Sequence, residues 1–251
     1  MSDRTVSNQL TDDERGLEAA LRPQGYSLML CNSGHEISLE QEYLDMLPRK
    51  GLDGLIVVPH DAAQEAPAEI AALPLPKVIL DQNIDGAPCV YTDFVGSANL
   101  LADALEQTGV ERILLVTGSR KMLRHQLRGD TLAGRFEVVE RIELAQDANA
   151  KRSSGNGDAD CDAVVCTGSH VAETYLSSQK KVDANRPLAC FDASSSLMAM
   201  PLPVMSCDRD IDAVADGILE LLLPQLRGGT PERSHVVVSS TVKTNHALAV
   251  G

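Results

Sequence analysis

The feature that most restricts the fold is a series of short apolar runs that are continuous rather than alternating, most of which end on a polar residue. Continuous apolar runs of this length are typical of strands buried on both faces, as in a parallel sheet covered by helices. The sequence therefore predicts an α/β fold with mostly parallel strands. The runs are GLIVV (54–58), KVIL (77–80), ILLV (113–116), AVVC (163–166) and LACF (188–191).

Helical patterns separate these runs, and the alternation of strand and helix starts again after residue 93. Residues 39–51, 94–109 and 210–229 carry apolar residues at helical spacing, and the last two stretches end on glycine. This restart predicts two lobes, each with its own sheet. We also expect a strand at 25–33 and a final strand at 235–242.

Other segments of the chain give weaker signals. A helix stopped by prolines is expected over residues 62–76, and residues 150–160, AKRSSGNGDAD, are expected to form a surface loop.

Composition limits the kinds of partner. The formal net charge is −14, with 36 acidic and 22 basic residues, which repels a phosphate backbone at long range and argues against nucleic-acid binding by this segment. Its six cysteines lie mostly in apolar stretches, as expected for reduced thiols. The start lacks the basic and apolar blocks of a signal peptide, and no apolar run is long enough for a membrane span. We therefore expect a cytoplasmic protein that does not contact a membrane.

The sequence offers no catalytic, cofactor or metal motif. CTGSHVA lacks the G-x-S-x-G turn of a nucleophile elbow, and no pair of acids stands out as a catalytic dyad. GNGDAD lacks the third glycine and the preceding strand of a dinucleotide loop. Cys161 and Cys166 have no histidine pair at metal-ligand spacing. We expect no enzyme activity, no cofactor and no metal site.

The order of the segments resembles one known family. Five segments follow one another in an order that resembles the effector-binding core of LacI/GalR transcription regulators. They are EYLDMLPRKGLDGLIVVP (42–59), PKVILDQNI (76–84), VYTDFVGSANLLADAL (90–105), DAVVCTGSHVA (162–172) and CFDASSS (190–196). The resemblance covers residues 16–247. It implies two Rossmann-like lobes of the type I periplasmic-binding-protein-like fold, with residues 1–92 and 209–228 in the N-terminal lobe and 93–208 and 229–251 in the C-terminal lobe.

The chain also departs from the family pattern. Nothing before Gly16 resembles the family's helix-turn-helix headpiece, so operator DNA would be bound only through a headpiece missing from these residues. The first core strand also looks absent or altered, because TVSNQLTDDE is short and polar.

The resemblance implies a ligand between the lobes, at the carboxyl ends of both sheets. Position by position, it assigns ligand contacts to residues that follow strands or open helices. Each has an ordinary structural alternative, because strand-end aspartates often cap the next turn, Asn and Ser form turns, and Arg124 could belong to a solvated basic face with Arg120, Lys121 and Arg128. The candidates are Asn32, Ser33, His60, Asp81, Asp93, Arg124, Ser169 and Asp192.

Carboxylates together with an arginine suit a ligand with hydroxyls and an anionic group, so the expected effector is a small sugar or sugar phosphate. The resemblance further implies a homodimer that relays ligand binding to DNA binding. A free sugar-binding protein of the same fold is the alternative. It is disfavoured by the lack of a signal peptide and by the few aromatic residues, 3% of the chain with no tryptophan.

Overall fold

The computed structural model describes residues 12–33, 37–59, 70–144 and 160–245. These residues form two compact units. Unit 1 contains the described residues up to Pro59, those from 70 to Tyr91, and Asp210–Val238. Unit 2 contains the described residues between Thr92 and Arg209 and those from Ser239 to Asn245.

Unit 1 is built on a four-stranded sheet in the order β1-β2-β3-β9, in which β1, β2 and β3 are parallel. Its core joins Leu17 and Leu21 of the first helix to Ile218, Leu221 and Leu222 of the last. The strands are β1 (Leu55–Val57), β2 (Lys77–Leu80), β3 (Cys89–Thr92) and β9 (His235–Val238). The helices are α1 (Asp12–Leu21), α2 (Ile37–Met46) and α8 (Ile211–Leu226), with 3-10 turns at Arg22–Gln24 and Leu47–Lys50.

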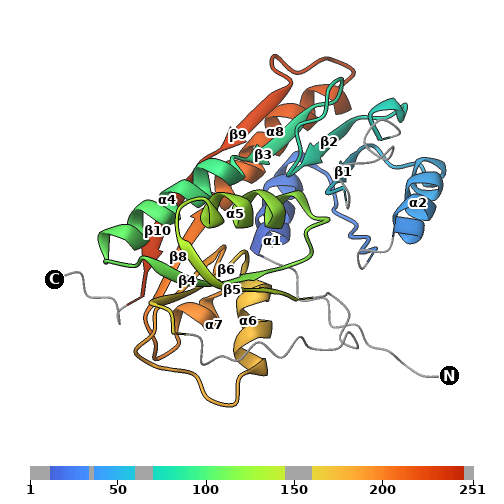
Figure 1. The fold of residues 1–251 in the computed structure, drawn as a ribbon. Helices are drawn as coiled ribbons and strands as arrows, with labels where there is room; N and C mark the ends of the chain where they lie inside the picture. Colours follow the sequence, from blue (N-terminus) through green and yellow to red (C-terminus); the bar gives the residue numbers. More distant parts are fainter. Residues whose placement is uncertain (1–11, 34–36, 60–69, 145–159, 246–251) are drawn as a thin grey trace. The chain divides into compact units, whose positions relative to one another are not determined.

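Unit 2 is built on a six-stranded sheet in the order β10-β8-β7-β6-β4-β5. Each neighbouring pair is parallel except β10 with β8, which is antiparallel (Figure 1). The strands are β4 (Arg112–Thr117), β5 (Glu137–Glu143), β6 (Ala163–Cys166), β7 (Leu188–Phe191), β8 (Val204–Arg209) and β10 (Ser240–Thr244). The helices are α4 (Phe94–Gln107), α5 (Leu123–Ala133), α6 (Ser169–Ser178) and α7 (Ser195–Met198).

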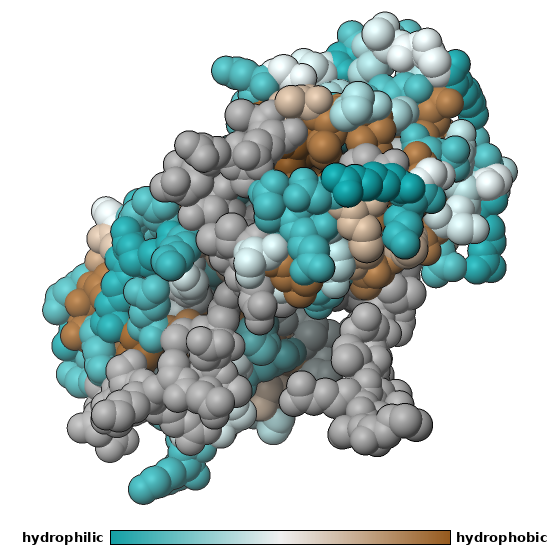
Figure 2. Space-filling model, turned by 90° about the vertical axis from the view of Figure 1, so that its right-hand side faces the viewer, coloured by the Kyte–Doolittle hydropathy of each residue, from teal (hydrophilic) through white to brown (hydrophobic). Residues whose placement is uncertain are grey.

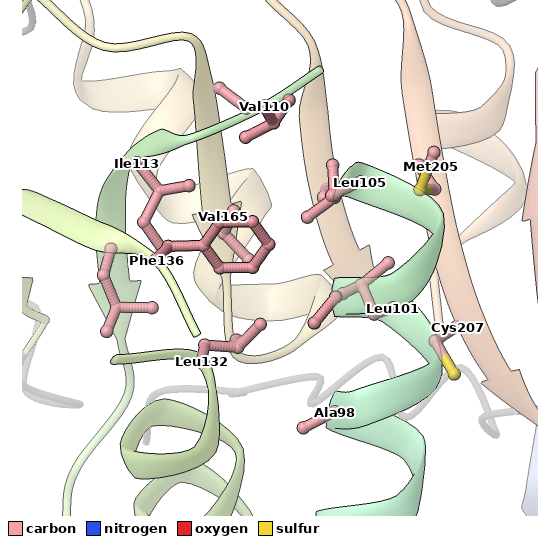
Figure 3. Close-up of a cluster of buried hydrophobic side chains, with 14 of the residues drawn as sticks. Ala98, Leu101, Leu105, Val110, Ile113, Leu132, Phe136, Val165, Met205 and Cys207 are labelled. Atoms are coloured by element: carbon pink, nitrogen blue, oxygen red, sulfur yellow. The ribbon is translucent and has the colours of Figure 1, made fainter. Parts of the chain in front are cut away.

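Two apolar clusters cover the two faces of the unit 2 sheet. In one, Ala98, Leu101 and Leu105 follow one side of α4 and pack with Ile113 and Val165 from the strands (Figure 3). The other cluster joins the opposite strand residues to α6 and α7. Burial on both faces explains why β4, β6 and β7 read as continuous apolar runs. The predicted α/β fold with mostly parallel strands is confirmed.

The predicted strand at 25–33 is wrong. Residues 26–33 have no strand assignment, and Met29 and Leu30 are 58% and 40% exposed. A strand needs a neighbour to bond its backbone groups. Among the described strands, β1 pairs with β2 alone, so no ladder reaches this apolar segment. Of the predicted helix over 62–76, residues 62–69 lie outside the described residues, residues 70–72 are helical and residues 73–76 are not. The predicted loop at 150–160 lies outside the described residues except for Asp160.

The predicted single strand at 235–242 is divided into two. β9 joins β3 in the sheet of unit 1, whereas β10 pairs with β8 in unit 2. The two strands are separated by Ser239 alone, where the chain passes from one unit to the other. Residues 229–238 therefore lie in unit 1, whereas the sequence-based boundaries had placed 229–251 in one lobe.

Five of the six cysteines are buried, and all six are free thiols. Burial raises the pKa of the Cys190 thiol to about 12 and that of Cys207 to about 11. Cys31, in the segment without a strand, is exposed. The interpretation of the cysteines as small buried apolar residues therefore holds for all except Cys31.

The described surface is mixed in character. Figure 2 shows hydrophilic colour over much of one face, interrupted by separate hydrophobic areas. Isolated exposed apolar side chains are normal on protein surfaces and do not by themselves mark an interface. The large ones are Met29, Leu30, Val58, Val95, Leu100, Val182 and Val237.

Candidate functional site

Polar residues follow the central strands of the unit 2 sheet. Thr117 ends β4, Thr167 follows β6, Asp192 follows β7 and Arg209 ends β8. These strands are parallel neighbours, so their carboxyl ends share one edge of the sheet. In open α/β sheets this edge is where ligands bind. The candidate site is therefore the carboxyl edge of the unit 2 sheet.

Asp192 has a special backbone conformation at this edge. Its φ is 53°, and the only other non-glycine residue with positive φ in the described chain is Asp81, at φ 60° after β2. Aspartate tolerates this left-handed region better than most residues, but the conformation persists only when surrounding contacts fix it. At Asp192 these contacts are hydrogen bonds: Oδ1 accepts from the backbone N–H of Arg209 and Oδ2 from Nη2 of Arg128, both at 3.1 Å.

Arg128 provides a buried cation beneath this carboxylate. The residue lies on α5 and is 2% exposed. Its guanidinium carbon is 4.2 Å from the ring centroid of Phe191 and 5.1 Å from that of Phe94, and Nη1 donates to the Thr167 carbonyl at 3.3 Å. Two aromatic faces and a carboxylate therefore compensate for the loss of water around the guanidinium. Arg128 is not part of a solvated basic face.

The Asp192 carboxyl remains ionised at neutral pH. Burial raises its pKa. The Arg128 guanidinium, the Arg209 side chain and the hydrogen bond from the Arg209 amide together lower the pKa by more than burial raises it, so the pKa of Asp192 lies below the ordinary value. The side chain is 33% exposed. Since two protein donors leave acceptor sites unused on the two oxygens, Asp192 can also accept hydrogen bonds from a ligand.

His125 fills the space between two of the strand ends. It lies on α5 one turn before Arg128, and it is 6% exposed. Its Nδ1 is 2.9 Å from the Thr167 hydroxyl, which also accepts from the Gly118 N–H at 3.1 Å. A Cβ at Gly118 would lie 2.6 Å from the imidazole, and one at Gly168 would lie 3.3 Å from it. The two glycines therefore make room for the histidine.

Further polar contacts brace the loop after β7. The Ala193 N–H donates to Ser206 Oγ at 3.0 Å and to Asp208 Oδ1 at 3.2 Å, and Ser206 is in turn bonded to Asp208. The Ser194 N–H donates to the hydroxyl of Ser169 at 3.1 Å. The backbone after Asp192 is thus held from β8 and from the start of α6.

The predicted site residues in unit 2 occupy different settings. Asp192 and Ser169 both lie at the carboxyl edge, although the Ser169 hydroxyl already accepts from Ser194. Arg124 lies in the first turn of α5, with Nη2 3.7 Å from the Met122 sulfur. The arginine paired with Asp192 is Arg128, one helical turn farther along, which sequence reasoning missed as a site residue.

The role of Asp93 is visible in its own helix. Its Oδ1 accepts from the Gly96 N–H at 2.8 Å, which is the N-cap bond of α4. The structural alternative for Asp93, a helix cap, is thereby present, and ligand contact remains a prediction.

The remaining predicted residues belong to unit 1 or lie outside the description. Asp81 follows β2, next to Gln82, whose amide donates to the Pro59 carbonyl at 3.2 Å. Asn32 is exposed and Ser33 is partly buried, in the segment without a strand. His60 lies outside the described residues. Ligand contact by these residues remains a prediction.

Two negative findings concern the described residues only. Within these ranges, no group of three or more His, Cys, Asp or Glu side chains is placed to hold a metal ion. Every helix in the same ranges falls short of the length or apolarity needed to cross a membrane.

Comparison with known proteins identifies relatives. No protein-family model matches the chain. It is 30% identical over 130 residues to the ribose operon repressor of Bacillus subtilis, and 37% identical over 151 residues to the transcriptional regulator PtxS of Pseudomonas aeruginosa. The matches cover 52% and 57% of this chain and 38% of each relative, so the chain spans well under half of these proteins. Both names describe regulators rather than enzymes.

Solved structures show the same fold over nearly the whole chain. The Cra transcriptional dual regulator of Pseudomonas putida, in complex with fructose 1-phosphate, matches with a TM-score of 0.72 over 93% of this chain and 92% of its own, at 20% identity. A periplasmic binding protein/LacI transcriptional regulator of Alkaliphilus metalliredigens, complexed with D-xylulofuranose, matches with a TM-score of 0.76 over 94% and 93%, also at 20% identity. The resemblance deduced from the sequence is confirmed: the chain is a homologue of LacI-family repressors and has the fold of their periplasmic-binding-protein-like core.

Proposed function

We propose that this chain is the ligand-sensing core of a LacI-type transcription regulator and that it binds a small sugar or sugar phosphate. The observation that carries the proposal is Asp192, an ionised carboxylate fixed in a left-handed conformation at the carboxyl edge of the sheet, with acceptor sites still open. Such a group suits the hydroxyls of a carbohydrate. The complexes of the similar regulators with fructose 1-phosphate and D-xylulofuranose support the same ligand class.

The phenylalanines offer no stacking platform for a sugar. The chain has three phenylalanines and no tryptophan, and Phe94, Phe136 and Phe191 are all buried. Of the four tyrosines, Tyr175 is buried, whereas Tyr26, Tyr43 and Tyr91 are partly exposed. The main argument against a free solute-binding protein is therefore the similarity to repressors.

Regulation would follow if ligand binding changed the populations of two conformations of the core. We propose that the ligand favours one arrangement of the core and that a homodimer transmits this preference to the DNA-binding part of the regulator. Operator DNA, the homodimer and a cytoplasmic location belong to this proposal. Sedimentation of the chain at micromolar concentration is expected to give twice the mass of one chain, and a single-chain mass would contradict the dimer.

Thermal denaturation with added carbohydrates tests the ligand class. At a concentration one hundred times its Kd, a ligand stabilises the native state by about 2.7 kcal/mol, which raises the Tm of a protein of this size by roughly 5 to 10 °C. D-ribose, D-fructose, fructose 1-phosphate and ribose 5-phosphate form a suitable panel, with inorganic phosphate as the control anion. If no sugar or sugar phosphate in a broad panel raises Tm or binds in calorimetry, the proposed function is wrong.

Substitution of Asp192 tests the location. Asp192→Asn keeps the shape but removes the charge, and we expect affinity for a bound sugar to fall by about 10-fold to 100-fold, the range for a hydrogen bond to a charged group. Glu111→Gln is the matched control, because Glu111 is an exposed acid just before β4, at the amino end of the same sheet. Equal affinity in Asp192→Asn and wild type would contradict the location at Asp192.

A further inference from the structure

Arg128 is the most buried charged side chain described in unit 2. At 2% exposure it has little water around it, and its Nε has no hydrogen-bond partner among the described residues. The guanidinium lies between the rings of Phe94 and Phe191, and its charge is balanced by Asp192. A buried cation is stable only while its counter-ion stays in place. The conformation of Arg128 and that of Asp192 therefore depend on each other.

Only one end of this network can meet a ligand. Asp192 is 33% exposed on its side chain, whereas Arg128 is covered by the two phenylalanine rings and by Thr167. A molecule that arrives at the edge of the sheet would touch the carboxylate and not the guanidinium. Arg128 can influence such a molecule through Asp192 alone.

The other end of the network reaches two places where the chain passes between the units. Phe94, which stacks on Arg128, is the third residue of unit 2 after Tyr91, the last residue of a unit 1 segment. Arg209, whose N–H donates to Asp192 Oδ1, is the last residue before the chain re-enters unit 1 at Asp210. A displacement of the Asp192 carboxylate would therefore change contacts beside both crossings.

We propose that Arg128 is a positioning residue that holds Asp192 in its left-handed conformation. Through this pair, a displacement of the Asp192 carboxylate changes the contacts of the crossing segments at Phe94 and Arg209. The part that concerns a ligand rests on the proposed function. The part that concerns the network does not, because it is argued from contacts between residues of the chain itself. The competing explanation is that Arg128 only fills space in the core.

The first experiment uses no ligand. Arg128→Met keeps much of the side-chain length but removes the charge and the donors, and Arg128→Lys keeps the charge. Arg135→Met is the matched control, because Arg135 pairs with Asp103 and Glu106 on the surface of unit 2. The two readouts, both from NMR, are the pKa of the Asp192 carboxyl and the hydrogen exchange rate of the Arg209 amide.

In Arg128→Met the pKa of Asp192 should rise, because the guanidinium that lowers it is gone while the burial that raises it remains. Exchange at the Arg209 amide should accelerate at least about tenfold, since its acceptor is no longer fixed. Arg128→Lys should restore the low pKa, and Arg135→Met should change neither readout. A purely structural role predicts a lower Tm with both readouts unchanged, and that result would overturn the proposal. If Arg128→Met does not fold, hydrogen exchange at the Arg209 amide in Asp192→Asn decides, because this variant removes the charge that Arg128 holds in place. Unchanged exchange at Arg209 in Asp192→Asn also overturns the proposal.

The second experiment adds D-ribose or fructose 1-phosphate to the wild-type protein and measures hydrogen exchange at residues 94–97 and 206–209. Binding should slow exchange in both segments. Arg128→Met and Asp192→Asn should each weaken binding, and the double variant should be no weaker than Asp192→Asn alone, because Arg128 acts through Asp192. Additive losses would mean that Arg128 acts independently, which contradicts the proposal. If neither probe nor any other sugar binds, the proposed function fails, and the ligand-free readouts still decide the role of Arg128.

Discussion

Asp93 lies just after the point where the chain passes from unit 1 to unit 2 at Thr92, and the sequence leaves two explanations for it, a ligand contact or a helix cap. The side chain is exposed, and its Oδ1 accepts from the Gly96 N–H at 2.8 Å, while the Asp93 carbonyl accepts from the Ser97 N–H at 2.8 Å. Asp93→Ala removes the side-chain bond and the negative charge beside the positive end of the α4 dipole. The cap explanation predicts a loss of stability without a ligand.

The magnitude follows from the two lost contributions. Loss of an N-cap side chain costs about 1 kcal/mol, and loss of a favourable charge at an exposed helix N-terminus costs about 0.3 to 1 kcal/mol. The expected total for Asp93→Ala is about 1 to 2 kcal/mol, which lowers Tm by roughly 3 to 6 °C in a protein of this size. Asp93→Ser keeps a capping oxygen, so it should lose only the smaller charge contribution.

Thermal denaturation followed by circular dichroism measures these differences, and Asp210 supplies a matched cap. Asp210 accepts from the Ala213 N–H at 3.0 Å at the start of α8, so Asp210→Ala should destabilise the protein by a similar amount. The cap explanation is refuted if Asp93→Ala leaves Tm within about 1 °C of the wild-type value. If Asp93→Ala and Asp93→Ser both abolish sugar binding at unchanged Tm, Asp93 is a ligand contact instead.

Three further predictions concern packing and thiol chemistry. Gly118→Ala should lower the free energy of unfolding, measured by chemical denaturation, by about 1 to 3 kcal/mol, because the new Cβ would lie 2.6 Å from the buried His125 imidazole. Gly134→Ala is the control and should be nearly neutral, because its nearest contact is at 3.4 Å. Equal effects of the two substitutions would contradict the close contact at Gly118. Leu101→Ala, at 0% exposure, should cost about 2 to 5 kcal/mol, and Leu100→Ala, at 44% exposure, less than about 0.5 kcal/mol. A thiol reagent should label Cys31 in the native protein and the five buried cysteines only after unfolding; rapid labelling of several thiols would contradict their burial.

The fold was predictable because strands that are buried on both faces of a sheet are apolar at every position. A strand such as Ala163–Cys166, with every residue buried, must be apolar throughout, and this pattern identifies a parallel sheet before any contact is known. Residues 26–33 show the limit of the same argument. YSLMLCNS has an apolar pattern suited to a strand, but a pattern cannot supply the neighbouring strand on which the hydrogen bonds depend.

The division of the last segment was beyond the sequence for a similar reason. HVVVSSTV reads as one strand, because nothing in its composition marks a change of partner. Val236 and Val238 are buried in unit 1, and the change of sheet occurs at Ser239, between two stretches of equal strand propensity. Which sheet receives each half depends on which edge strand is open, and only the assembled fold determines this.

The candidate site was predictable at its carboxylate and not at its cation. Asp192 directly follows a buried strand, so the position of its side chain at the edge of the sheet follows from the end of LACF. The partner had to be chosen among arginines of one helix, where Arg124 and Arg128 lie four residues apart and share a face. The structure separates the two: a Cβ at Gly129 would lie 2.8 Å from Nη2 of Arg141 and 3.3 Å from Thr117, so α5 packs closely against β4 and β5 beside Arg128. Arg128 is 2% exposed at this point, and a buried arginine requires an acid. The acid that the strand pattern supplies is Asp192, so close helix-to-sheet packing, and not the spacing of basic residues, distinguishes Arg128 from Arg124.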